Sequence, residues 1–286
     1  MRQQTIGMEL EFTGLTRQTA AQVVANVFGT TARTGGRGWQ ASDDEGRTWN
    51  VVPDSSIRAN GGEQCELVSP ILRWGDIETV QRIVRELRAA GAKVNDSCGL
   101  HVHIGAAGMT AKAVRNLVNN FASHEALLIK ALDVHAKRKR YCKPLNREFL
   151  NRLNARKPTT LAELGEVWYN LPEADFPTYH YHESRYTTLN LHALFTKGTV
   201  EFRIFNSTLH AGEVKTALQL ACALVANAKG AKKTIYRLVQ TENERFAMRT
   251  WLTRPQGLNL NGEEFSTLRY HLTKRLDGNA AWRFAV

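Results

Sequence analysis

The stretch Thr5 to Phe12, which reads TIGMELEF, constrains the fold more than any other part of this sequence. Every even position from Ile6 onward is apolar, whereas Glu9 and Glu11 lie at odd positions. Strict alternation predicts a half-buried strand, because successive side chains point to opposite faces of a sheet. Two carboxylates about 7 Å apart would then share the exposed face. Taken alone, this pair is typical of a solvated polar face, since like charges side by side need water or a counter-ion over them.

Three later segments repeat this layout, with an apolar face and a face of charged or imidazole side chains. Each is ordinary when taken singly, because lone histidines are common in cores and on surfaces and an exposed ion pair contributes little. If all four strands join one antiparallel sheet, however, their polar side chains converge on its open face. The segments are Gln64 to Val68 with Glu66, Leu100 to Ile104 with His101 and His103, and Gly198 to Phe205 with Glu201 and Arg203.

Apolar residues at helical spacing predict four helices that would cover the apolar face of this sheet. We therefore predict an α+β fold, with a curved, mainly antiparallel sheet that has an open acidic face and helices packed on the other face. The four helices are Thr16 to Phe28, Ile77 to Ala90, Thr110 to Ala136 and Ala211 to Lys229. Further short strands are expected at Trp49 to Val52, Lys93 to Asp96 and Tyr186 to Ala193, and a glycine-rich loop at Gly29 to Gly38.

No internal repeat, low-complexity segment or linker interrupts the chain, so we expect a single domain over residues 1–286. A helical or lid insertion is expected at about 110–185, with short helices near Leu145 to Asn154 and Leu161 to Asn170. The pattern after about residue 230 predicts a helical C-terminal extension, with helices at Lys233 to Leu252 and Gly262 to Arg275.

The net charge of +11 predicts affinity for anionic partners, although charge says nothing about the fold. Much of the excess lies in Lys137 to Lys143 and Arg147 to Lys157, which are either solvated segments or a phosphate or nucleic-acid patch. The four cysteines form no CxxC pair, which argues against a zinc ribbon or a disulfide framework. Without a membrane-spanning run or an apolar signal region, we expect a cytoplasmic protein with no membrane partner.

Four glutamates converging in one concavity would repel one another, and burying them without cations would be costly. Hard divalent ions such as Mg²⁺ or Mn²⁺ relieve this repulsion and share their coordination shell with water and phosphate. Arg203 would then meet an anion such as phosphate, which its guanidinium fits bidentately. The segment Gly29 to Gly38 lacks the GK[ST] ending of a P-loop. The residues therefore predict a metal–phosphate site built on a sheet.

Five motifs in order resemble the amidoligase family, whose members are carboxylate–amine ligases similar in fold to glutamine synthetase and glutamate–cysteine ligase. The resemblance implies a glutamine synthetase catalytic-domain-like fold and an ATP- and Mg²⁺-dependent enzyme. Such an enzyme forms an amide through an acyl phosphate. The motifs cover about residues 5–210 and read GMELEF, PDSS, ELVSP, GLHVHIG, and RYTTLNLHAL with TVEFRIF.

The resemblance also implies a role for each matching residue, with two or more Mg²⁺ or Mn²⁺ ions. Glu63 would lie on the opposite strand face from Glu66, which leaves its role unassigned. The implied metal ligands are Glu9, Glu11, Glu66, His101 and Glu201. The residues implied for ATP are Arg203 and His101, with the basic residues Arg138, Arg140 and Lys143 as further candidates for the nucleotide or substrate side. Asp54, Arg203 and His103 are implied in catalysis, and Asp54, Ser56, Tyr186 and Asn190 in substrate binding.

Two other functions stay open. The HVH triplet has the spacing of HUH-type nucleases, which use a metal and a tyrosine nucleophile, and Tyr179, Tyr181 and Tyr186 are available. A non-catalytic basic nucleic-acid-binding module would also account for the charge. For a ligase, the substrates would be a small-molecule or peptide carboxylate and an amine. The positive charge favours an acidic component, such as an acidic peptide, a cell-wall precursor or a nucleic-acid base.

Overall fold

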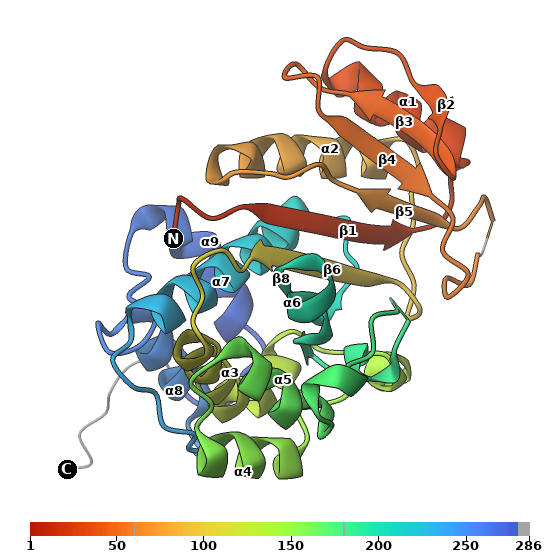
Figure 1. Cartoon of the computed structure of the whole chain (residues 1–286). Coiled ribbons are helices and arrows are strands. Elements are labelled where there is room, and N and C mark those ends of the chain that lie inside the picture. The colour runs from red at the N-terminus through yellow and green to blue at the C-terminus, as the bar shows by residue number, and fades with distance from the viewer. Residues whose placement is uncertain (60, 180, 280–286) are drawn as a thin grey trace.

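Eight strands form one antiparallel, curved and unclosed sheet (Figure 1). The computed structural model describes residues 1–59, 61–179 and 181–279. The order across the sheet is β2-β3-β4-β5-β1-β6-β8-β7. In chain order the strands are β1 Ile6–Phe12, β2 Arg33–Gly35, β3 Gly38–Ser42, β4 Thr48–Val52, β5 Cys65–Val68, β6 Gly99–Gly105, β7 Leu189–Asn190 and β8 Thr199–Asn206.

Strand β1 lies in the middle of the sheet, between β5 and β6. Its alternating apolar side chains are all but fully buried, with 0–2% of each exposed from Ile6 to Phe12. The same alternation buries Val102 on β6 and Phe202 on β8, so one face of the sheet is continuously apolar. This confirms the predicted α+β class and the strand expected at the start of the chain.

Helices α1, α2, α3 and α7 form a layer on the apolar face (Figure 1). Helix α1 packs on β3 and β4, α7 packs on β6, and α3 places Phe121 edge-on against Phe202 of β8. Thr16 and Thr110 cap the first turns of α1 and α3, as their position before apolar-periodic segments predicts. The helices in the described residues are α1 Arg17–Val27, α2 Ile77–Ala89, α3 Ala111–Ala131, α4 Arg147–Arg156, α5 Leu161–Tyr169, α6 His192–Lys197, α7 Ala211–Gly230, α8 Glu244–Thr253 and α9 Ser266–Thr273.

Two predictions near the N-terminal half of the sheet are wrong. The expected loop Gly29 to Gly38 contains strand β2, which pairs with β3. The turn between the two strands includes Gly36, whose backbone is in the left-handed region (φ 56°). Glycine supplies that turn, but the same glycine content obscured the strand before it. The expected strand Lys93 to Asp96 is reduced to a single bridge between Thr13 and Lys93.

The expected strand Tyr186 to Ala193 is also wrong in most of its length. Only Leu189 and Asn190 pair with β8, and the chain then enters helix α6. The side chain of Asn190 explains the change, because its Oδ1 accepts a 2.7 Å hydrogen bond from the amide of His192. A local side-chain acceptor of this kind favours a turn over continued pairing.

The C-terminal region differs from its prediction as well. Residues 231–243 form neither a helix nor a strand, and α8 begins only at Glu244, so the helix expected at Lys233 to Leu252 is half absent. Helix α3 ends at Ala131 rather than Ala136, and a 3-10 helix follows at Ala136–Arg140. Residues 280–286 of the expected extension lie outside the described residues. No helix of the described chain has the length and apolar character needed to cross a bilayer.

Candidate active site

Strand register brings the predicted polar residues together on the face opposite the helix layer. Glu9 of β1 lies directly across from His101 of β6, and Glu11 lies across from Glu66 of β5. His103 of β6 lies across from Glu201 of β8 in the same way. Directly opposed side chains on neighbouring strands are within contact range, so four strands contribute to one cluster.

A bulge in β8 adjusts the outer side of this cluster. Leu100 pairs with Phe205 and Val102 with Phe202, so β8 carries one more residue than β6 between the two pairs. The extra residue keeps both phenylalanines on the apolar side, while Arg203 stays close to Glu201 on the other side. Bulges of this kind re-aim a side chain without breaking the sheet.

Three groups of possible metal ligands form a connected row in this cluster. Within each group the ligand atoms all lie within 4.8 Å of one another. The first and second groups share Glu9, and the second and third share Glu66. The groups are Glu9, His103 and Glu201; Glu9, Glu66 and His101; and Glu11, Asp54 and Glu66.

His103 gives a direct indication that this donor set fits a cation. Its Nε2 is buried and has no hydrogen-bond partner, although it lies 3.4 Å from Glu9 Oε1 and 3.8 Å from Glu201 Oε1. Its Nδ1 is within 2.9 Å of Thr199 Oγ1, a contact that orients the ring and leaves Nε2 for a ligand. Each group also contains at least two carboxylates, which are ligands that suit Mg²⁺ or Mn²⁺.

Two glutamates hold their protons more tightly than usual. Burial raises the pKa of Glu66 to about 9, and the nearby Glu9, Glu11 and Asp54 add to this shift. Burial also raises the pKa of Glu11 to about 7, against the hydrogen bond that Glu11 accepts from the amide of Gly99. At neutral pH the cluster therefore retains protons that a divalent ion would displace.

The other end of the row is held in its charged form. Burial opposes ionisation of Glu201, but Arg203, whose Nη1 lies 2.6 Å from Glu201 Oε1, acts together with His103 and His101 to lower the pKa of Glu201 to about 2. Asn190 donates a 2.6 Å hydrogen bond to the second oxygen of Glu201. Burial lowers the pKa of His101 to about 4, so this ring is neutral at pH 7 and contacts Glu9 through Nδ1 at 3.1 Å.

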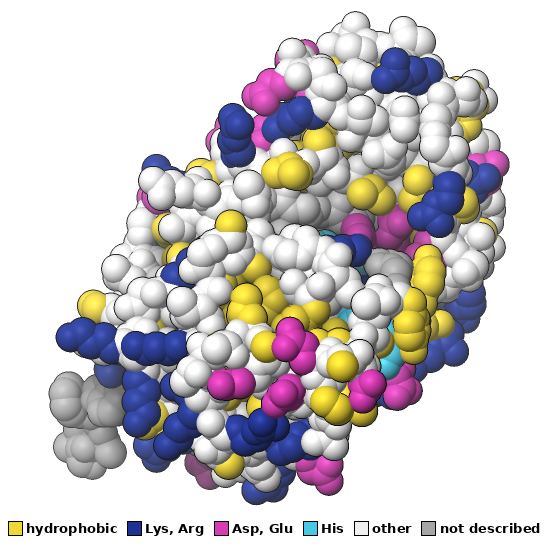
Figure 2. Space-filling model, viewed as in Figure 1, with side chains coloured by type: hydrophobic (Ala, Val, Ile, Leu, Met, Phe, Trp, Pro, Cys, Tyr) yellow, Lys and Arg dark blue, Asp and Glu magenta, His cyan; other side chains and the backbone are white. Residues whose placement is uncertain are grey.

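Glu9, Glu11, Glu66 and His101 of this cluster form one wall of a cavity of about 530 Å³. Figure 2 shows acidic and histidine side chains at the bottom of a hollow, with basic and apolar side chains at its rim. Arg138 is buried beside them, where it donates to the carbonyls of Arg203 and Phe205. A cationic side thus faces an acidic side across a space large enough for a small ligand. The cations lining the cavity are Arg37, Arg138, Arg185 and Arg203.

The chain matches one family of known proteins over most of its length. A family model described as "Putative amidoligase enzyme" matches residues 2–225. The chain belongs to this amidoligase family. Comparison with curated proteins yields no match. The matched range of this amidoligase contains the whole cavity and ends within α7, so α8 and α9 lie beyond it.

The remaining residues predicted for this amidoligase fall into two sets. Asp54 and Ser56 line the cavity from the loop after β4, where Asp54 Oδ1 accepts a 2.7 Å hydrogen bond from the amide of Ser56, and Tyr186 lines it too. Five predicted residues are not part of the cavity lining. His103 and Glu201 lie beneath it in the buried cluster, and Arg140, Lys143 and Asn190 lie outside it. Arg140 is exposed over the ring of Tyr141, and the Lys143 backbone pairs with that of Tyr186 and Thr188. Glu63 ion-pairs with Arg17 at 3.2 Å, away from the metal-ligand groups.

Sequence reasoning missed several residues that line the amidoligase cavity. Arg37 reaches it from the β2–β3 hairpin, and its only local signal is its position between glycines. Tyr141 lies inside the basic run that includes Arg138, and it is the one aromatic residue of that run. Arg185 lies next to Tyr186 and stacks over its ring at 5.7 Å. None of these positions has a periodic pattern that predicts it.

Proposed function

We propose that the protein is an ATP-dependent carboxylate–amine ligase that uses two or more Mg²⁺ or Mn²⁺ ions. The observation that carries the proposal is the row of three ligand groups joined through Glu9 and Glu66. Membership of an amidoligase family supports the formation of a carbon–nitrogen bond. Because the proposed reaction consumes ATP, we expect it to take place in the cytoplasm.

The chain's own residues would hold the ions in neighbouring positions that share ligands. Glu9, His103 and Glu201 form one position, Glu9, Glu66 and His101 a second, and Glu11 with Asp54 completes a third through Glu66. When bound, the ions would neutralise the phosphates of ATP and polarise the transferred phosphoryl group. We assign His103 as a metal ligand rather than as a catalytic residue, since its unpaired Nε2 points to Glu9 and Glu201.

The proposed reaction has two steps. An oxygen of the substrate carboxylate attacks the γ-phosphorus of ATP, the bond to ADP breaks, and an acyl phosphate forms. The amine nitrogen then attacks the acyl carbon, inorganic phosphate leaves, and an amide remains. Two anions must approach each other in the first step, so Arg203 and the other cations of the cavity would offset their charge. Asp54 lies in the same cavity and would accept the proton that the amine loses.

The segment between α3 and β7 supplies the other half of the cavity. Arg138, Tyr141, Tyr181, Arg185 and Tyr186 all come from it, which supports its proposed role as a lid over the sheet. Tyr186 and Ser56 would contact the substrate. Arg140 and Lys143 remain candidates for ATP binding only if the lid moves, because they lie outside the lining here. The cationic rim favours a substrate with an acidic component.

The nuclease alternative keeps one supporting observation. Tyr181 and Tyr186 line the same cavity as His101, whereas Tyr179 does not. That alternative requires Mg²⁺-dependent nicking of single-stranded DNA and a covalent tyrosine adduct. The ligase requires neither. The glutamates favour the ligase, because the HUH motif assigns them no role.

The test is release of ADP from ATP in the presence of Mg²⁺ and mixed pools of carboxylic acids and amines, with products followed by mass spectrometry. We expect a product whose mass equals acid plus amine minus water, formed together with ADP. Glu9→Gln and Glu201→Gln should each lower ADP release at least about 100-fold, because each removes a carboxylate charge from a proposed ion position. Glu63→Gln is the matched control and should retain activity, since Glu63 lies outside the cavity. Full turnover in Glu201→Gln would refute the assignment.

A further inference from the structure

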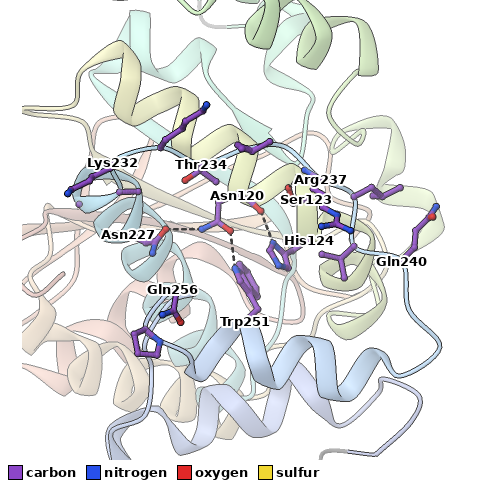
Figure 3. A pocket seen from close by; sticks show the side chains of 17 residues that line it. Asn120, Ser123, His124, Asn227, Lys232, Thr234, Arg237, Gln240, Trp251 and Gln256 are labelled. Carbon is purple, nitrogen blue, oxygen red and sulfur yellow. Dashed lines mark hydrogen bonds between the residues drawn. The ribbon is translucent and has the colours of Figure 1, made fainter. Parts of the chain in front are cut away.

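The segment that links α7 to α8 crosses the outer side of helix α3 as irregular chain (Figure 3). We call residues 231–240 the strap. Polar side chains one turn apart on α3 hold its inner edge by pairing with its backbone. The hydrogen bonds are Asn116 Nδ2 to Ala231 O at 2.8 Å, the Thr234 amide to Asn116 Oδ1 at 2.9 Å, Asn119 Nδ2 to Thr234 O at 2.9 Å, and the Arg237 amide to Ser123 Oγ at 2.9 Å.

The strap leaves other backbone groups without partners. Within the described part of the chain, the amides and carbonyls of residues 232, 233, 235, 236 and 238 make no hydrogen bond. A row of unpaired N–H and C=O groups resembles the edge of a sheet, which can pair with another extended chain. Ile235 and Leu238 project from the same segment and are 69% and 45% exposed.

A cavity of about 1010 Å³ runs between the strap and helices α3 and α8. Three cations line it, Lys232, Lys233 and Arg237, and none of its lining residues is acidic. At its base His124 stacks on Trp251, with ring centroids 4.1 Å apart, and His124 Nδ1 lies 2.9 Å from the carbonyl of Asn120 (Figure 3). The cavity is therefore cationic, with a rigid aromatic base.

We propose that this groove binds an acidic peptide segment in extended conformation. The unpaired backbone of the strap would hydrogen-bond to the peptide backbone, the three cations would meet its carboxylates, and Ile235 and Leu238 would contact its aliphatic side chains. A peptide fits better than a nucleic acid. Single strands bind by stacking their bases on aromatic rings, but the rings of His124 and Trp251 stack on each other.

The groove is separate from the acidic cavity on the sheet. The two cavities share no lining residue, and the strap lies after the residues that match the amidoligase family. The strap and its cations therefore lie outside the family match, whereas the α3 residues of the groove lie within it. The groove would capture a protein partner, or a peptide part of a substrate, without taking part in bond formation. This inference does not depend on the proposed ligase activity.

Fluorescence polarisation of the full-length protein with a labelled peptide of about eight alternating glutamates and valines tests the proposal without ATP. The variant Lys232→Glu/Lys233→Glu should weaken binding roughly three- to tenfold, as loss of two exposed ion pairs predicts. The matched control Arg85→Glu/Arg88→Glu makes the same charge change on exposed positions of α2 and should leave binding unchanged.

Two further probes separate the possible causes of binding. A peptide with the same side chains but N-methyl groups at alternate residues should bind at least about tenfold more weakly, since it loses backbone hydrogen bonds. The proposal is overturned if the acidic peptide does not bind, or if the two double variants bind it equally. It is also overturned if N-methylation has no effect, or if an oligothymidine of equal charge binds more tightly than the peptide.

Discussion

Binding of Mg²⁺ should release protons from the acidic cluster, and the amount is set by Glu66. With a pKa of about 9, Glu66 carries a proton in most molecules at pH 8. That proton must leave before the carboxylate can bind a metal ion. One pH unit below a pKa corresponds to about a tenfold loss of apparent affinity. Affinity for Mg²⁺ should thus rise about tenfold per pH unit between pH 7 and 9, and more steeply below pH 7, where Glu11 is also protonated.

Isothermal titration calorimetry in two buffers of different ionisation enthalpy measures this release. We expect roughly one proton per binding event at about pH 8, and close to none at about pH 10. Glu66→Gln removes the titrating group, so its proton release at pH 8 should fall to near zero while its affinity for Mg²⁺ also drops. Glu63→Gln provides the control, because Glu63 ion-pairs with Arg17 outside the cavity.

Two results would refute this reasoning. Tight Mg²⁺ binding at pH 8 without proton release would show that Glu66 is ionised in the metal-free protein. Undiminished proton release in Glu66→Gln would show that another group carries the proton.

Three further predictions concern Glu66, Arg203 and Asn116. The metal-free protein should lose stability as the pH rises from about 7 to 9, since the folded pKa of Glu66 lies above its unfolded value and His101 is neutral throughout this range; Mg²⁺ should restore the stability, and a melting temperature that rises with pH over this range without metal would contradict this. Arg203→Lys keeps the charge but loses the planar fork beside Glu201, so ADP formation should fall at least about tenfold, and unchanged turnover would be the contrary result. Asn116→Ala should destabilise the fold by about 1–3 kcal/mol in urea unfolding, because Ala231 and Thr234 lose partners, and its ADP formation should equal that of the unmodified protein.

The sheet and the acidic cluster were predictable because their signals are periodic and local. Alternation on β1 identified which side chains share a face, and the repeat of that pattern on β5, β6 and β8 predicted their convergence. The sequence could not predict the register that pairs Glu9 with His101, but it did predict that both side chains lie on the same face of the sheet. That was sufficient to anticipate the cluster that the structure shows.

Elements held by distant partners were not predictable. The strap looks helical in sequence, yet Asn116 and Asn119 bind its backbone from 115 residues away. Helix α6 replaced a predicted strand for a local reason, because Asn190 Oδ1 accepts a hydrogen bond from the amide of His192, the first residue of the helix. In the basic run, Arg138 is buried beside the cluster while Arg140 is exposed, and a run of like charges carries no signal that separates them.

Anomalous diffraction from crystals grown with Mn²⁺ and a non-hydrolysable ATP analogue would show whether the glutamates of the acidic cluster hold divalent ions beside ATP. We expect Mn²⁺ peaks in at least two positions, one between Glu9, His103 and Glu201 and one between Glu9, Glu66 and His101, with phosphates on the side of Arg203. Crystals that contain the analogue without any Mn²⁺ peak against these glutamates would contradict this expectation.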